Sequence, residues 1–298
     1  MDFFPSFRLP SDRLEALARA ALAEDGASGD VTVRATLPPG RRVRAALVAR
    51  QAGICAGLPV VRAVYRVLDR RVTVRACVRE GGRLRAGQRV VRLSGPARSI
   101  LSGERTALNF LQRLSGIATM TRRCVDAVRG TGVEILHTRK TTPLLRLLER
   151  WAVRMGGGRL HRGDLRGAVL IKENHLAAAG ARDAEAVRAL IRGACARAPG
   201  GLPVEVEVQD VGLLPDVLEA GVDIVMFDNL PLDALREGVR RVRSHARRTG
   251  RRVIVEASGG MTLDRLRAVA RTGVDAISIG AITHSAPALD YSLDITDD

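Results

Sequence analysis

Two hydrophobic patterns alternate along the second half of the chain. Short apolar runs have strand character, and between them apolar residues recur every three to four positions, as on one face of a helix. The expected strands are Glu134–His137, Ala168–Ile171, Val204–Val208, Ile224–Phe227, Val253–Ala257 and Ala276–Ile279. The expected helices between them include Ala184–Ala198, Leu213–Ala220, Leu232–His245 and Leu263–Arg271. This alternation predicts parallel strands joined by crossover helices.

Polar residues or glycines stand at the end of each expected strand. They include Arg139 and Lys140, Lys172 and Glu173, Asp228 and Asn229, Ser258 to Gly260, and Gly280. In a βα barrel the active site is built at the carboxyl ends of the strands, whereas a doubly wound sheet places its ligand at one switch point. The pattern therefore favours an α/β barrel of six to seven strands.

The first 115 residues lack this rhythm. Expected strands at Val43–Arg50, Val72–Val78 and Gln88–Leu93 follow an expected helix over 12–24, and turns rich in Gly and Pro separate them. Further helical stretches are expected over 96–114 and 117–129. We expect a separate α+β domain over 1–115 and a barrel domain over 116–281.

Basic residues dominate the charge of the chain, with a formal net charge of +16. A nucleic-acid partner is one explanation. However, aromatic residues make up only 3% of the sequence, which leaves few platforms for stacking bases. Lysine occurs only at Lys140 and Lys172, and the other 46 of the 48 basic residues are arginine. Both lysines follow expected strands, and arginine does not replace lysine where a compact ammonium group is needed.

The expected compartment is the cytoplasm, with no membrane association. No apolar stretch is long enough to span a bilayer, and the first ten residues lack the organisation of a secretory signal. The four cysteines stand far apart, without the spacing of a metal site, which favours buried thiols in a reducing compartment.

Several short motifs offer groups that bind anions. Thr138–Thr142 combines two cations with three hydroxyl groups, which suits a carboxylate or phosphate. Gly156–Gly158 leads to His161 and Arg162, which could neutralise a second carboxylate. A solvated loop is the alternative for each segment.

Carboxylates and glycines complete the candidate site. Glu207 and Asp228 fall on neighbouring expected strands and suit Mg²⁺ or sugar hydroxyls. Glu205 faces the same way as Glu207, so the pattern leaves open which of the two is functional. Ser258–Gly260 and Gly280 resemble a phosphate cradle formed by the last two strands, with tight turns as the alternative.

Taken together, these motifs resemble quinolinate phosphoribosyltransferase. The matching segments, in the order of that family, are Glu104–Asn109, Thr138–Pro143, Gly156–Gly158, His161-Arg162, Leu170–His175, Glu205–Val208, Asp228-Asn229, Ala257–Gly260 and Gly280–Ser285. Glu24-Asp25 and Gly29–Thr32 match upstream. The chain departs from the family at His137, where an aspartate or small residue is expected, and at Leu144, which replaces a usual glycine.

The resemblance implies an incomplete α/β barrel and an N-terminal open sandwich domain joined by the tail 282–298. It also implies transfer of a phosphoribosyl group from phosphoribosyl pyrophosphate to quinolinate, with decarboxylation, in a homodimer or a higher oligomer. Arg105 would reach into the partner's site, and Arg139, His161 and Arg162 would bind quinolinate beside it.

By the same resemblance, Lys140 and Lys172 would lie between quinolinate and the pyrophosphate. Glu207 and Asp228 would hold ribose hydroxyls and the Mg²⁺ that accompanies pyrophosphate. The 5′-phosphate would be bound by Ser258, Gly259, Gly260 and Gly280.

The sequence leaves three alternatives open. A related group associated with molybdenum transport shares the scaffold, although Lys172–His175 favours the quinolinate enzyme. An aldolase could use Lys172 as a Schiff-base amine. A basic nucleic-acid-binding protein is the alternative that is not an enzyme.

Overall fold

The chain folds into two compact units. The computed structural model describes residue 7 and residues 9–296, so most of the segment inspected for a secretory signal lies outside the described residues. We call residues 123–140 and 158–281 the barrel unit, and residues 7–122, 141–157 and 282–296 the sandwich unit. The two units interleave along the sequence. The sequence pattern predicted one boundary near residue 115, and the family resemblance implied that the tail 282–298 returns to the first domain.

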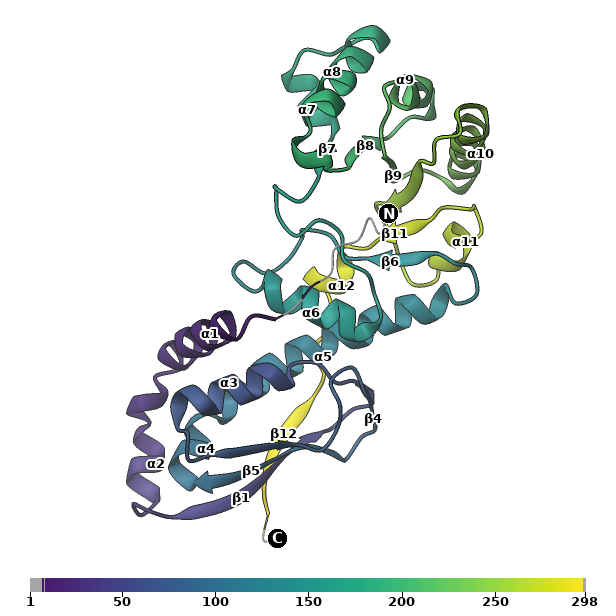
Figure 1. Ribbon diagram of the computed structural model, residues 1–298. Coiled ribbons are helices and arrows are strands. Elements are labelled where there is room, and N and C mark those ends of the chain that lie inside the picture. Colours follow the sequence, from purple (N-terminus) through teal and green to yellow (C-terminus); the bar gives the residue numbers. More distant parts are fainter. Residues whose placement is uncertain (1–6, 8, 297–298) are drawn as a thin grey trace. The chain divides into compact units, whose positions relative to one another are not determined.

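An antiparallel sheet forms the centre of the sandwich unit (Figure 1). Its strands lie in the order β12, β1, β5 and β3, with bounds Tyr291–Thr296, Arg42–Ala49, Gln88–Pro96 and Thr73–Ala76. Residues Ala45–Ala49 of β1 are all buried, so both faces of this part of the strand are covered. The tail joins this sheet because β12 pairs with β1 along its whole length.

Helices cover this sheet. Helix α3 packs on β3, α4 packs on β1 and β5, and α1 packs on α3. The helices of the sandwich unit are α1 (Ser11–Glu24), α2 (Val31–Thr36), α3 (Leu58–Leu68), α4 (Ala97–Ser102), α5 (Glu104–Ala127, which continues into the barrel unit) and α6 (Arg146–Gly156). The short strands β2 (Gly53–Ile54) and β4 (Arg83–Leu84) form a separate pair.

The expected helix break near residue 115 is wrong. The break lies at Gly103, between α4 and α5, and Gly116 is inside α5. A Cβ atom at Gly116 would stand 2.0 Å from the carbonyl oxygen of Pro287. The glycine therefore allows close packing of the chain on the helix and does not end it.

The barrel unit contains six parallel strands in the order β6, β11, β10, β9, β8 and β7. Their bounds are Glu134–Leu136, Ala276–Ser278, Ile254–Ser258, Ile224–Asp228, Val204–Val208 and Val169–Ile171. A single parallel bridge joins Leu136 to Arg159 on the other side of β6. Strands β6 and β7 are not paired with each other in the described sheet, so the expected incomplete α/β barrel is confirmed.

Helices follow most of these strands, as the periodicity predicted. They are α7 (Glu173–Ala178), α8 (Ala184–Arg197), α9 (Leu214–Glu219), α10 (Leu232–Thr249), α11 (Leu266–Ala270) and α12 (Ala281–His284, which continues into the sandwich unit). Three short 3₁₀ turns lie at Ala27–Gly29, Pro199–Gly201 and Val211–Leu213. Across the described chain, every helix is too short or too polar to traverse a lipid bilayer.

Strand register places the polar side chains of the barrel unit in rows. Glu207, Met226 and Glu256 are register partners across β8, β9 and β10. Asp228 is the partner of Ser258, two residues further along the same strands. Because side chains at every second position share one face, each row faces the same side of the sheet.

Candidate active site

Eight of the predicted site residues line one cavity in the barrel unit, of about 350 Å³. These residues are Arg139, Lys140, His161, Arg162, Lys172, Glu207, Asp228 and Ser258. They follow or end strands β6, β7, β8, β9 and β10, except for the pair at 161–162, which lies in the loop before β7. The carboxyl ends of the parallel strands therefore meet at this cavity, as expected for an α/β barrel.

Two glycines of the predicted phosphate cradle stand beside this cavity. A Cβ atom on Gly259 would lie 2.8 Å from Oδ1 of Asp228, and Gly259 has a φ of +80°. Gly260 also has a positive φ, of +55°. Both positions need glycine for their backbone conformation.

The remaining predicted residues lie apart from the cavity lining. Gly280 lies between β11 and α12 and is not among the residues that line the cavity. Arg105 belongs to the sandwich unit and is exposed in the first turn of α5.

An ion pair joins Lys172 to Glu207 at the ends of β7 and β8. Lys172 is also the N-cap residue of α7, where its backbone N–H donates to Nδ1 of His175 at 3.0 Å. The side chain of Glu207 is 8% exposed. Of the two glutamates on β8, Glu207 lines the cavity, and Glu205 lies deeper in the barrel unit.

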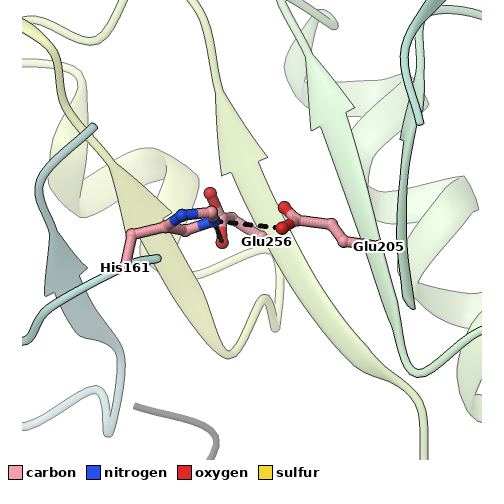
Figure 2. A group of neighbouring side chains, drawn as sticks. All are labelled: His161, Glu205 and Glu256. Atoms are coloured by element: carbon pink, nitrogen blue, oxygen red, sulfur yellow. Dashed lines mark ion pairs between the residues drawn. The ribbon is translucent and has the colours of Figure 1, made fainter. Parts of the chain in front are cut away.

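Glu205 takes part in a second buried cluster with His161 and Glu256, which we call the buried triad (Figure 2). Nε2 of His161 lies 3.0 Å from Oε2 of Glu205 and 3.6 Å from Oε2 of Glu256. The side chains of His161, Glu205 and Glu256 are 11%, 1% and 2% exposed. Figure 2 shows Nε2 turned towards both carboxylates.

Burial and charge shift the pKa values of the triad. Burial alone disfavours a charged ring, but the bond to Glu205 and the charges of Glu256 and Glu205 raise the pKa of His161 to about 9. Burial and the neighbouring Glu205 raise the pKa of Glu256 to about 7. At neutral pH the histidine is therefore an imidazolium, and Glu256 is partly protonated.

The two arginines near the triad are close enough to influence each other. Burial and the charge of Arg139 lower the pKa of Arg162, although an arginine keeps its proton at neutral pH. Nη1 of Arg162 donates to the carbonyl oxygen of Ala168 at 3.1 Å, which fixes its position before β7. The cavity thus gathers two arginines, two lysines and two histidines around three acidic side chains.

Sequence reasoning missed several residues that line the cavity, above all Glu256, Ser278 and His137. A signal existed for Glu256, because it interrupts the apolar run of β10 at the inward-facing register of Ser258. His137 is fully buried after β6, and its Nδ1 lies 2.7 Å from the carbonyl oxygen of Thr138. The sequence marked His137 as a departure from the family without indicating that it faces the cavity.

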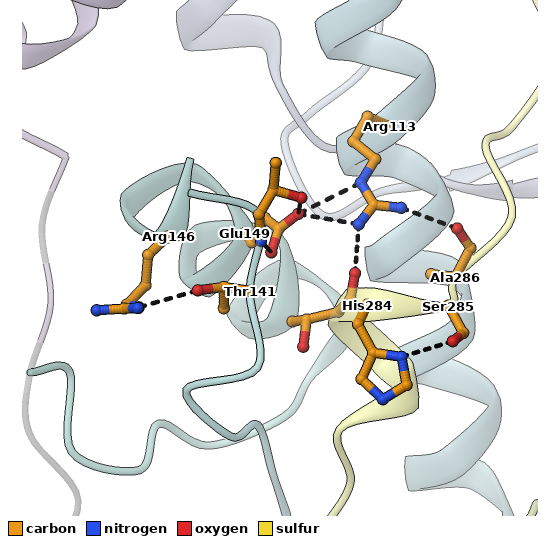
Figure 3. Close-up of polar contacts among 9 residues, drawn as sticks. Arg113, Thr141, Arg146, Glu149, His284, Ser285 and Ala286 are labelled. Carbon is orange, nitrogen blue, oxygen red and sulfur yellow. Dashed lines mark hydrogen bonds and ion pairs between the residues drawn. The ribbon is translucent and has the colours of Figure 1, made fainter. Parts of the chain in front are cut away.

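The motif that begins at Thr138 continues into the sandwich unit (Figure 3). There the backbone N–H of Thr142 donates to the buried Glu149 at 3.1 Å, and Glu149 also pairs with Arg113 at 2.9 Å. Nε of Arg146 donates to Oγ1 of Thr141 at 2.9 Å. These contacts anchor the segment that follows Lys140.

Leu144 lies in this segment with an unusual backbone. Its φ is +64°, in the left-handed region, and the residue is 90% exposed. A glycine adopts this conformation without strain. The structure therefore explains why the resemblance leads one to expect glycine at this position.

The glycines at 156–158 do not line the cavity. Gly156 ends α6, and Gly157 caps it with a φ of 91°. A Cβ atom on Gly156 would lie 2.5 Å from the carbonyl oxygen of Ala118. These two glycines therefore serve helix capping and close packing.

Comparison with known proteins agrees with this geometry. Residues 30–115 match the model of the quinolinate phosphoribosyl transferase N-terminal domain, and residues 117–294 match that of the C-terminal domain. The chain belongs to the quinolinate phosphoribosyl transferase family. It is 42% identical to the nicotinate-nucleotide pyrophosphorylase [carboxylating] of Mycobacterium leprae, covering 93% of this chain and 95% of that protein.

Other members of the family are similar over nearly the whole chain. The probable nicotinate-nucleotide pyrophosphorylase [carboxylating] of Bacillus subtilis is 40% identical, covering 95% of this chain and 94% of that protein. A solved structure of the nicotinate-nucleotide pyrophosphorylase from Francisella tularensis superposes with a TM-score of 0.86 at 36% identity, covering 97% and 98% of the two chains. The fold of this chain is thus the fold of the family.

Proposed function

We propose that this protein transfers the phosphoribosyl group of phosphoribosyl pyrophosphate to quinolinate. The products are nicotinate mononucleotide, pyrophosphate and carbon dioxide, in the de novo biosynthesis of NAD. Membership of the family supports the reaction, and the two arginines and two lysines that line the cavity support a substrate pair rich in negative charge. We further propose a homodimer, as the family resemblance implies. We also propose that the protein is cytoplasmic, since its four cysteines are free thiols and suit a reducing compartment.

Quinolinate carries two carboxylates, and the arginines of the cavity suit them. A guanidinium group can bind a carboxylate through two parallel hydrogen bonds. We assign Arg139, Arg162 and His161 to quinolinate in the barrel unit, with Arg105 supplied by the partner subunit. The two lysines complete the cavity as point charges next to the pyrophosphate of the donor.

Two carboxylates of the cavity also suit Mg²⁺. Glu207 and Asp228 present carboxylate oxygens to the cavity from β8 and β9, and oxygen is the ligand atom that Mg²⁺ prefers. When bound with pyrophosphate, the ion would offset the negative charge that develops on the leaving group. Ribose hydroxyls would share the same two carboxylates.

The 5′-phosphate suits the end of β10. Ser258 lines the cavity, and Gly259 and Gly260 follow it with the positive φ values that an exposed run of backbone N–H groups requires. We assign these residues and Gly280 to the phosphate. The loops after the last two strands of a barrel are a frequent place for such a site.

The chemistry needs no covalent enzyme intermediate. Departure of pyrophosphate leaves positive charge on the ribose C1, which the ring nitrogen of quinolinate attacks. Fixed charges from Lys140 and Lys172 stabilise the departing pyrophosphate. The ion pair between Lys172 and Glu207 argues against an aldolase, because an ammonium group held by a carboxylate is a poor amine nucleophile.

The decisive experiment supplies purified protein with phosphoribosyl pyrophosphate, Mg²⁺ and either quinolinate or nicotinate. We expect nicotinate mononucleotide from quinolinate alone, detected by chromatography together with released carbon dioxide.

Lys140→Ala should lower turnover on the order of a hundredfold, since a preorganised charge is lost.

Two outcomes would contradict the proposal. Product from nicotinate only would reassign the acceptor, and no product from a folded dimer would point to the molybdenum-associated relatives. Near-normal turnover of Lys140→Ala would remove that residue from the site.

A further inference from the structure

The buried triad offers chemistry beyond the binding of quinolinate. Phosphoribosyl transfer needs cations around the pyrophosphate and the carboxylates, and the arginines and lysines of the cavity supply them. The triad adds a histidine whose Nε2 lies 3.0 Å from Oε2 of Glu205 and 3.6 Å from Oε2 of Glu256. His161 therefore differs from the arginines assigned to quinolinate, because it also lies against two buried acidic groups.

The triad differs from the arginines and from Lys172 in its ability to release a proton. Arginine does not release a proton at physiological pH, and the ammonium group of Lys172 is paired with Glu207. His161 is a group that exchanges a proton readily, because its ordinary pKa lies near neutrality. The carboxylates keep it in the protonated form at neutral pH, with a pKa of about 9.

The geometry also fixes which proton is available. Nε2 lies within ion-pair distance of Glu205 and Glu256, whose negative charge favours a proton on that nitrogen. Among the described residues no hydrogen bond engages Nδ1 of His161, and the residue lines the cavity. In an imidazolium placed in this way, the N–H at Nε2 faces the acidic side chains, and the N–H at Nδ1 is available to a substrate in the cavity.

We propose that His161 donates the proton that replaces the lost carboxylate, and that Glu205 and Glu256 are the positioning residues that hold it ready. This inference rests on the proposed function. In the step, the bond between C2 of the pyridinium ring and its carboxylate breaks, and carbon dioxide leaves. The electron pair stays on C2, beside the positive ring nitrogen. The proton on Nδ1 then forms the new C2–H bond.

Solvent replaces the proton that His161 donates. After donation His161 is a neutral imidazole that keeps its N–H towards Glu205. When product leaves, the open cavity admits water, from which Nδ1 regains a proton. No oxidant, metal or further reactant is needed.

The experiment compares the two products that report on the two steps. Quinolinate labelled in its 2-carboxylate is supplied with phosphoribosyl pyrophosphate and Mg²⁺, and labelled carbon dioxide and pyrophosphate are counted over time. The unaltered protein should release one carbon dioxide for each pyrophosphate. His161→Gln keeps a polar side chain but has no proton to give. It should release pyrophosphate more slowly, because one contact to quinolinate is weakened, but the release of labelled carbon dioxide should fall on the order of a hundredfold further, so that the nucleotide with both carboxylates accumulates.

Matched variants sharpen the result. His245→Gln makes the same change on α10, away from the cavity lining, and should keep the one-to-one ratio. Glu205→Gln should uncouple the two products in the same direction by a smaller factor, because the ring loses the charge that orients it. Circular dichroism checks that each variant is folded, and the Glu205 variant carries the test if His161→Gln does not fold.

The outcomes separate this inference from the proposed function. If the unaltered protein releases no pyrophosphate with quinolinate, the proposed function fails. If the unaltered protein is coupled and His161→Gln slows both products equally, the histidine only binds substrate and the proton-donor role is overturned. Uncoupling in both variants, with a coupled His245→Gln, supports the role.

Discussion

At the scale of single residues, Leu144 combines two unfavourable features. Its backbone lies in the left-handed region, with a φ of +64°, and its large apolar side chain is 90% exposed. Left-handed backbone costs an L-residue roughly 1–2 kcal/mol. Such strain persists only where the surrounding structure enforces it, and here the anchored contacts of Thr142 and Glu149 on either side of Leu144 do so.

We therefore predict that Leu144→Gly stabilises the protein. Relief of the strained backbone is opposed by the greater entropy of glycine in the unfolded chain, which costs about 0.5–1 kcal/mol. The net gain should be on the order of 0.5–1 kcal/mol, measured as a higher urea midpoint with an unchanged slope. Leu165→Gly is the matched control, because Leu165 is 71% exposed and has no positive φ. That control should be neutral or destabilised, and equal stabilisation of both variants would refute the strain argument.

Reasoning from single residues of the sequence identified most of the residues that line the cavity. The scarcity of lysine is enough to single out Lys140 and Lys172, and both line the cavity. The same reasoning missed Glu256, whose one signal is that it interrupts the apolar run of β10 two residues before Ser258. Only the curvature of the barrel unit shows that Glu205 and Glu256, on strands separated by β9, reach the same histidine.

At the scale of elements, the apolar runs predicted all six parallel strands because strands buried on both faces are nearly continuous in hydrophobicity. Helices α2, α3, α6, α7 and α12 were not predicted. Helix α6 begins without a side-chain cap, so the sequence lacks a start signal there, although its leucines and arginines favour a helix. The misplaced break at residue 115 has a different cause, since close packing and helix termination both select glycine.

The packing of α10 on β9 gives an element-scale prediction. A Cβ atom at Gly238 would lie 2.4 Å from Cζ of the buried Phe227. Although alanine favours helix by about 1 kcal/mol over glycine, Gly238→Ala should lower the free energy of unfolding by about 1–3 kcal/mol, because the helix must move away from the strand. Urea unfolding followed by circular dichroism measures the change.

Gly193→Ala on α8 is the comparison variant. Its new Cβ would meet only the end of the flexible Arg197 side chain, at 3.0 Å. This variant should be neutral or gain up to about 1 kcal/mol. If Gly238→Ala leaves the free energy of unfolding unchanged, α10 can move away from β9 without loss of stability, and the prediction is wrong.

At the scale of the whole molecule, the predicted site residues are divided between the two units. Eight of them line the cavity of the barrel unit, whereas Arg105 is exposed on α5 of the sandwich unit. Neither the sequence pattern nor the fold of one chain states which subunit's cavity Arg105 serves. The homodimer that we propose resolves this, because a two-fold axis completes two equivalent sites at once.

Complementation between two inactive variants tests that arrangement. Arg105→Ala and Lys140→Ala should each be nearly inactive alone, since each lacks a cation that the substrates require. In a mixed dimer, the barrel unit of the Arg105 variant keeps its lysine and receives an intact arginine from its partner. One of the two sites is then complete, and the other lacks both residues. With half of the dimers mixed after random reassociation, activity should return to about a quarter of that of the unaltered protein. If Arg105 instead served the cavity of its own chain, every site in the mixture would lack one cation, and mixing would restore nothing.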